Sequence, residues 1–340
     1  MPTDFVSGQE MSRRFYSEAV RPVLDTAFPG LPHSAALLGR GSEVLGYDDA
    51  MSSDHNWEPR VQLFLRDDDH VRHADAVTEA LRQKVPARFA DHDTEFGVYT
   101  LSGYFQQELN FDLGQEITAR DWLTFSEQNL STVTAGAVFH DEVGLAEVRE
   151  RFAYYPRDVW LYLLIAGWWR VHPEVNLVGR TGFVGDELGS GLIGARLVRE
   201  LMHLCFLLEC KYAPYPKWFG TAFSRLSCGP SLAPILRTVL RAESWQDREA
   251  ALMTAYEEIG RMYNSLQITP AVELGIEQMC GRPFKVVWGD YVGPLAAEIK
   301  DPAVREIAER WPVGGIDQLR EIMWPARWRG QLLAVFDTAR

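Results

Sequence analysis

The chain has 340 residues, enough for two domains or one large one. Its hydrophobic share of 46% and charged share of 24% are those of an ordinary globular protein. The net charge of −13 argues against non-specific binding to nucleic acid, because the phosphates would be repelled. No apolar run approaches the ~18 residues that a membrane span needs. The four cysteines have neither zinc-site spacing nor a CxxC pair, which predicts reduced thiols in a cytoplasmic protein.

The first third of the chain predicts helices beside a small mixed sheet. Apolar side chains recur on one helical face until Pro29 and Gly30 end the pattern. The predicted elements are a helix over residues 11–28, strands over residues 33–38 and 60–65, a helix over residues 71–84 and a strand over residues 95–101.

After about residue 119 the periodicity becomes helical, and Pro and Gly residues separate the segments. Helices are predicted over residues 122–135, 142–152, 157–171, 187–213, 232–242, 245–266, 301–310 and 316–323. The sequence therefore predicts an α+β protein. A small mixed-sheet domain is expected in residues 1–135, and a mainly helical bundle domain in residues 136–340.

Residues 37–65 contain the pattern on which a functional hypothesis depends. An apolar run leads into a tight turn at Gly41 and Ser42, and Asp54 comes shortly before the next apolar segment. A glycine turn lets backbone N–H groups approach a triphosphate, and an Asp beside the following strand can hold Mg²⁺ against the same phosphates.

Other polar residues of this segment have competing interpretations. Asp48 and Asp49 favour a solvated loop, because Asp is a common turn former. His55 is either a metal ligand or proton shuttle, or a hydrogen-bonded neighbour of Asp54. Trp57 favours packing over stacking on a base.

The helix predicted over residues 187–213 carries a basic stripe. Its members recur at three- and four-residue spacing and continue on both sides of a proline-rich turn: Arg196, Arg199, His203, Lys211 and Lys217. In an acidic protein such a stripe needs a partner. The sequence leaves two open, namely the phosphates of a nucleotide and the carboxylates of Asp186 and Glu187 at the helix start.

Three segments, residues 39–60, 154–170 and 184–226, together resemble a bacterial domain family of unknown function placed in the nucleotidyltransferase superfamily. The resemblance implies a phosphate-binding turn at Gly41 and Ser42 and a metal carboxylate at Asp54. The superfamily has a second acid two positions later, where this chain has Asn56. A third acid is expected in the strand over residues 95–101, whose only carboxylate, Glu95, stands at its start.

The leading hypothesis is an enzyme that moves a nucleotidyl group from a Mg²⁺-bound nucleoside triphosphate to a small-molecule acceptor. Its expected site residues are Asp54 and His55 for catalysis, Asp54 and Asn56 for the metal, and Gly41, Ser42, Arg196, Arg199, Lys211 and Lys217 for the nucleotide. A non-catalytic nucleotide- or metabolite-binding protein is the second hypothesis, favoured by the neutral Asn56. A third is an enzyme that uses Asp54 and His55 in the same cleft for other chemistry. The nucleobase, the acceptor and the oligomeric state stay open.

Overall fold

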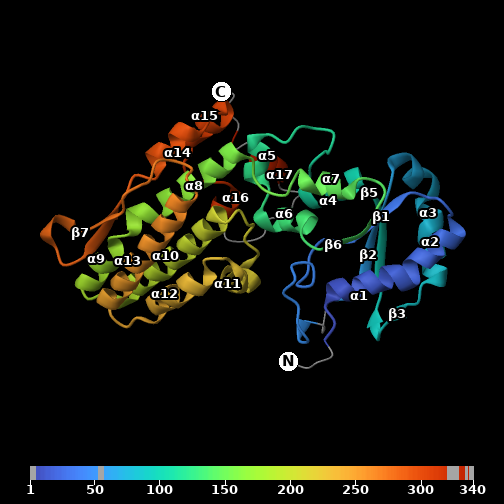
Figure 1. Ribbon diagram of the computed structural model, residues 1–340, viewed down its shortest axis with the longest axis horizontal. Helices are drawn as coiled ribbons and strands as arrows, with labels where there is room; N and C mark the ends of the chain where they lie inside the picture. Colours follow the sequence, from blue (N-terminus) through green and yellow to red (C-terminus); the bar gives the residue numbers. More distant parts are fainter. Residues whose placement is uncertain (1–4, 53–56, 320–328, 334–335, 337–340) are drawn as a thin grey trace. The chain divides into compact units, whose positions relative to one another are not determined.

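The computed structural model describes residues 5–52, 57–319 and 329–333, and residue 336 (Figure 1). The chain divides into two compact units. The first unit contains residues 1–116, 127–153 and 324–330, and the second contains residues 117–126, 154–323 and 331–340. Within the described ranges, no helix has the length and apolar character needed to cross a membrane.

A four-stranded mixed sheet lies at the centre of the first unit. Its strands, in spatial order, are β5 (Glu95–Thr100), β2 (Arg60–Leu65), β1 (His33–Leu37) and β6 (Ala137–Asp141). β1 is antiparallel to both β2 and β6, whereas β2 and β5 are parallel. Because the neighbouring strands β1 and β2 run in opposite directions, the C-terminal end of β1 lies beside the N-terminal end of β2.

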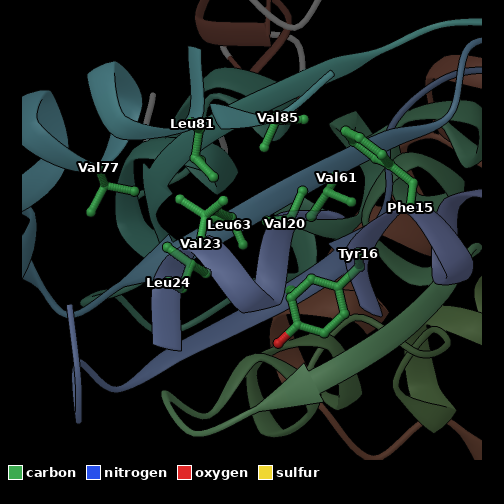
Figure 2. Packing of buried hydrophobic residues seen from close by; sticks show 11 residues of the cluster. Phe15, Tyr16, Val20, Val23, Leu24, Val61, Leu63, Val77, Leu81 and Val85 are labelled. Atoms are coloured by element: carbon green, nitrogen blue, oxygen red, sulfur yellow. The ribbon is translucent and has the colours of Figure 1, made fainter. Parts of the chain in front are cut away.

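Helices pack against the apolar face of this sheet. They are α1 (Gly8–Phe15), the π-helical turn η1 (Tyr16–Val20), α2 (Arg21–Ala27) and α3 (Asp67–Lys84). Figure 2 shows side chains from the helices and from β2, among them Val20, Leu63 and Leu81, pointing toward one another. Each is fully buried, which contributes roughly 1.5–3 kcal/mol per side chain. The π-helical turn lies just before Pro22, whose ring cannot take part in a regular helical hydrogen bond.

The remaining elements of the first unit are β3 (Arg88–Phe89), β4 (His92–Asp93), α4 (Leu101–Leu109), α6 (Glu127–Thr134) and α7 (Leu145–Glu150). Gly136 ends α6 and leads into β6. Its φ of +79° lies in the left-handed region, and a Cβ there would come within 2.0 Å of the Leu37 carbonyl oxygen. Arg149 Nε donates to the Val133 carbonyl at 2.9 Å and so caps the end of α6.

The second unit is mainly helical. Its helices are α5 (Ala119–Thr124), α8 (Arg157–Val171), η3 (His172–Glu174), α9 (Leu177–Phe183), α10 (Glu187–Leu208), α11 (Pro216–Arg225), α12 (Gly229–Arg241), α13 (Trp245–Ser265), η4 (Met279–Gly281), α14 (Val292–Glu298), α15 (Pro302–Arg310) and α16 (Ile316–Leu319). A hairpin of β7 (Gly275–Gln278) and β8 (Lys285–Trp288) lies between α13 and α14. A short helix, α17 (Arg329–Leu333), follows the gap in the described chain.

The predicted α+β class, with a small mixed sheet followed by a mainly helical region, is confirmed. The helix predicted over residues 122–135 is instead two helices, because Phe125 adopts an extended conformation between α5 and α6. β6 was not predicted, and residues 127–153, which include it, belong to the first unit. The helix expected over residues 187–213 ends earlier, at Leu208, before Cys210 with its φ of +51°.

Candidate functional site

The predicted phosphate-binding turn follows β1, near the place where β1 ends and β2 begins. Gly41 has a φ of +139°, a conformation that favours glycine, and Ser42 is buried. Within the described chain, no hydrogen bond uses the backbone N–H groups of Gly41 and Ser42. Successive backbone N–H groups at a glycine turn are donors of the kind that bind anions.

A buried ion pair lies beside this turn. Arg60 Nη2 is 2.7 Å from Glu43 Oε1, and the two side chains are 9% and 1% exposed. Arg60 also donates to the Arg40 carbonyl, so it ties the turn to the start of β2. Burial raises the pKa of Glu43 although Arg60 opposes the shift, and Glu43 Oε2 has no hydrogen-bond partner in the described structure. This pair is not among the residues predicted from the sequence, although an acid directly after a Gly-Ser turn was the available signal.

The loop acids Asp48 and Asp49 have structural roles. Asp48 Oδ2 accepts from the Gly8 backbone N–H at 2.7 Å and from Trp57 Nε1 at 2.9 Å. Asp49 Oδ1 accepts from the backbone N–H of Met51 at 2.9 Å, as a turn-forming Asp does. Trp57 is 4% exposed, as expected for a packing aromatic.

Asp54, His55 and Asn56 lie outside the described residues, so their catalytic and metal-binding roles stay predictions. Glu95 begins β5 and pairs in parallel register with Arg60. Its side chain is exposed. Glu95 lies at the end of the strands at which β1 leads into the Gly41 turn.

Three members of the basic stripe lie on α10 and have partners within the second unit. Arg196 forms an ion pair with Glu174. The Arg199 guanidinium lies 5.9 Å from the centre of the Phe219 ring, and the His203 ring lies 4.5 Å from the same ring. These contacts are favourable without a ligand.

The two acids at the start of α10 are used elsewhere. Asp186 Oδ1 caps the helix by accepting from the Gly189 backbone N–H at 2.7 Å. Glu187 Oε2 lies 3.1 Å from Nη1 of Arg248, which is itself buried. Their carboxylates therefore serve α10 and α13.

Lys211 and Lys217 are exposed. Lys211 lies after the end of α10, and Lys217 lies in the first turn of α11. Lys217 Nζ lies 4.9 Å from the centre of the Trp218 ring. Gly41 and Ser42 belong to the first unit, whereas Lys211, Lys217 and the arginines of α10 belong to the second. Their joint contact with one nucleotide stays a prediction.

His203 is expected to make stability depend on pH. Burial lowers its pKa to about 4. The charge of Glu200 opposes this shift, and the charges of Arg199 and Arg170 add smaller effects in the same direction as burial. A lowered pKa means that the native state binds the proton less tightly than the unfolded chain. Stability from the neutral ring is therefore present above pH 6.5 and is lost as the pH falls toward 4, by up to about 3 kcal/mol.

Urea unfolding of wild type and His203→Gln between pH 7.5 and 4.5 checks this expectation. The stability of wild type should fall relative to that of His203→Gln as the solution becomes more acidic. His172→Gln, which changes an exposed histidine of the same unit, is the control. Parallel curves for wild type and His203→Gln would contradict the prediction.

One group of described side chains has the composition of a metal site. The candidate ligand atoms of His33, His140 and Glu142 all lie within 4.8 Å of one another. Hydrogen bonds already engage them: the Tyr16 hydroxyl lies 2.9 Å from His33 Nε2, and His140 Nε2 lies 3.2 Å from Glu142 Oε2. This network accounts for all three groups without an ion. This group could not be predicted from the sequence, because the antiparallel pairing of β1 and β6 brings the residues together.

Comparison with known proteins finds similarity to a family model and to a solved structure. A family model described as "Domain of unknown function (DUF4037)" matches residues 122–219. The crystal structure of a nucleotidyltransferase-like protein from Exiguobacterium sibiricum 255-15 aligns with a TM-score of 0.32 and 10% identity, over 82% of this chain and 97% of that one. No curated protein matches the chain. The expected resemblance to a family of unknown function is thus confirmed for the matched segment.

Proposed function

We propose that the first unit binds the triphosphate of a nucleotide at the turn of Gly41 and Ser42 and that the protein moves a nucleotidyl group to a small-molecule acceptor. The observation that carries the proposal is the pair of unengaged N–H groups at this turn. They lie near the end of β1 and the start of β2, which are neighbouring strands of the mixed sheet. Backbone N–H groups in such a turn favour anions.

The proposal requires a cation at the same place. The protein has a net charge of −13, and the Glu43 carboxylate lies beside the turn, so a triphosphate alone would be repelled. Asp48 and Asp49 accept hydrogen bonds within the protein, and the resemblance described above gives Asp54 as the expected Mg²⁺ ligand, with Asn56 two positions later in the sequence. Mg²⁺ would offset the phosphate charge, and positioning would supply much of the catalysis.

A second candidate function is nucleotide binding without transfer. It is favoured by Asn56, a neutral residue where the superfamily pattern has an acid. It is also favoured by the position of Glu95, whose exposed side chain stands at the very start of β5. An enzyme that uses Asp54 and His55 for other chemistry is the remaining candidate.

Asp54→Asn is expected to abolish Mg²⁺-dependent binding of a nucleoside triphosphate while changing stability by no more than about 0.5 kcal/mol. The measurement is calorimetric titration with non-hydrolysable analogues of the four common triphosphates, with and without Mg²⁺. Asp49→Asn, in the same loop, is the matched control, because Asp49 serves only a local turn in the structure. Circular dichroism and thermal unfolding verify that both variants are folded.

The outcomes separate the three candidates. Binding that needs Mg²⁺ and is lost only in Asp54→Asn supports the transferase. Binding that is independent of Mg²⁺ and insensitive to the substitution supports the binding protein. If no triphosphate binds wild type under either condition, the result supports the enzyme of other chemistry, and the role of the Gly41 turn in nucleotide binding is wrong.

A further inference from the structure

Two histidines and a glutamate share one face of the sheet in the first unit. His140 and Glu142 are two residues apart at the end of β6, and side chains two apart along an extended chain point to the same side. On the neighbouring strand, His33 begins β1, and its carbonyl accepts from the Glu142 backbone N–H at 3.1 Å. The strand pairing therefore brings the three side chains together, and the centres of the two imidazole rings are 4.6 Å apart.

The ligand atoms of these three residues are close enough for one metal ion. They lie within 4.8 Å of one another, and His140 Nε2 is 3.2 Å from Glu142 Oε2. A tetrahedral zinc ion, with bonds of about 2.0–2.2 Å, holds its ligand atoms roughly 3.3–3.6 Å apart. The pair of His140 and Glu142 already has nearly this spacing, and the nitrogen of His33 must approach by at most about 1.5 Å.

The surroundings of His33 hold its ring as a neutral ligand. Its Nδ1 lies 3.1 Å from the Leu31 carbonyl oxygen, which can only accept, so this nitrogen carries the proton and Nε2 keeps its lone pair. Metal-binding histidines commonly use such a bond from the second ring nitrogen to fix their orientation. Burial lowers the pKa of His33, so the ring stays neutral at pH 7, as ligation requires.

The hydrogen bonds that satisfy these groups without an ion can be replaced by bonds to a metal. The Tyr16 hydroxyl, 2.9 Å from His33 Nε2, takes the lone pair that a metal would use. A cation that binds between His140 and Glu142 likewise displaces the proton of their hydrogen bond. Three protein ligands leave a fourth position for water, to which the Tyr16 hydroxyl can donate instead.

The donor set favours zinc over the hard cations. Imidazole nitrogens suit Zn²⁺, whereas Mg²⁺ and Ca²⁺ prefer oxygen ligands. The side chains of His140 and Glu142 are 22% and 51% exposed, so an ion can enter from solvent, while His33 is only 6% exposed. The group therefore combines one buried, oriented ligand with two that solvent can reach.

We propose that His33, His140 and Glu142 bind a zinc ion, with water as the fourth ligand. His33 begins β1, whereas the Gly41 turn follows the end of that strand, so the two sites lie toward opposite ends of β1. None of the three residues takes part in the nucleotide site proposed above. The zinc site is therefore independent of the proposed function.

Zinc titration of the tag-free, full-length protein tests the proposal, after treatment with EDTA and in competition with a chromophoric chelator at pH 7.5. Wild type should bind zinc at micromolar concentration. His140→Gln and Glu142→Gln should each bind it at least about tenfold more weakly, because even the loss of an outer partner of a metal ligand costs about 10- to 100-fold in affinity. His73→Gln, which changes another half-buried histidine of the first unit, is the matched control and should bind as wild type does.

Cobalt gives a second measurement that reports the ligands directly. Wild type should develop the visible absorption bands of four-coordinate Co²⁺, zinc should remove them, and both variants should lack them. Circular dichroism verifies folding, and Glu142→Gln, which changes an exposed side chain, should fold as wild type does. Wild-type zinc affinity in either variant, or no zinc binding by wild type, would overturn the proposal. Cobalt–thiolate bands in its place would assign the metal to the exposed Cys210 or Cys280 and would also overturn it.

Discussion

Replacing Arg60 by alanine is expected to lower the free energy of unfolding by about 3–5 kcal/mol at pH 7, the usual cost of removing one partner from a buried ion pair. Arg60 lies 2.7 Å from the Glu43 carboxylate, and both side chains are buried. Without the guanidinium, the Glu43 carboxylate would lose its charged partner in a buried place where Oε2 already lacks a hydrogen bond. Urea unfolding measures the loss.

This loss is expected to grow as the pH rises. Burial raises the pKa of Glu43 above 4.5, and removal of Arg60 raises it further. The native state then binds the Glu43 proton more tightly than the unfolded chain does. Stability from that proton is present below pH 4.5 and is lost as the pH rises through the folded-state pKa, so the gap between wild type and Arg60→Ala widens toward pH 7.

Arg88→Ala is the matched control in the same unit. The Arg88 guanidinium is 64% exposed and lies 3.7 Å from an Asp93 oxygen, an exposed pair whose loss costs no more than about 1 kcal/mol. If the loss of unfolding free energy in Arg60→Ala is the same at pH 4.5 and at pH 7, the Glu43 charge is not the cause of that loss.

Replacing Glu200 by alanine is expected to cost about 3 kcal/mol in the second unit, at the lower end of the range for a broken buried pair because Arg170 is partly exposed. Glu200 Oε2 and Oε1 accept from Arg170 Nε at 2.7 Å and Nη2 at 2.6 Å, which joins α10 to α8. The Arg170 side chain is 20% exposed, and its Nη1 also donates to the Gln318 carbonyl at 3.0 Å. Scanning calorimetry of the full-length variant measures the effect.

Glu258→Ala provides the comparison for this prediction. Glu258 pairs with Arg261 on α13 at 3.0 Å, but the arginine is 66% exposed. Loss of such a surface pair is expected to change stability by about 0.2–1 kcal/mol. If Glu258→Ala and Glu200→Ala melt at the same temperature, the bidentate pair does not hold α8 and α10 together.

The long helices could be predicted from sequence because their signals are local. α8 begins directly after Pro156, and its apolar residues continue to Val171, so both ends match the prediction. β6 could not be predicted in the same way. It has five residues, its side chains are mostly half-buried, and its strand conformation depends on pairing with β1, which lies about a hundred residues earlier.

The same distinction between local signals and contacts of distant residues applies to the candidate site. The turn at Gly41 could be located from a glycine that follows an apolar strand, because the φ requirement is local. The Glu43–Arg60 pair depends on the antiparallel return of β2, and the grouping of His33 with His140 depends on β6. Such contacts between distant positions leave no periodic signal in a single sequence.

β6 also determines where the chain can be divided. A gene fragment that stops at residue 135 would lack this strand and would leave β1, whose five residues are all buried, as an open edge that can pair with other chains. The chain also enters the second unit over residues 117–126 before it returns to form α6 and β6. Neither unit is a continuous stretch of sequence, so genetic recombination at a single crossover point cannot transfer either one intact to another protein.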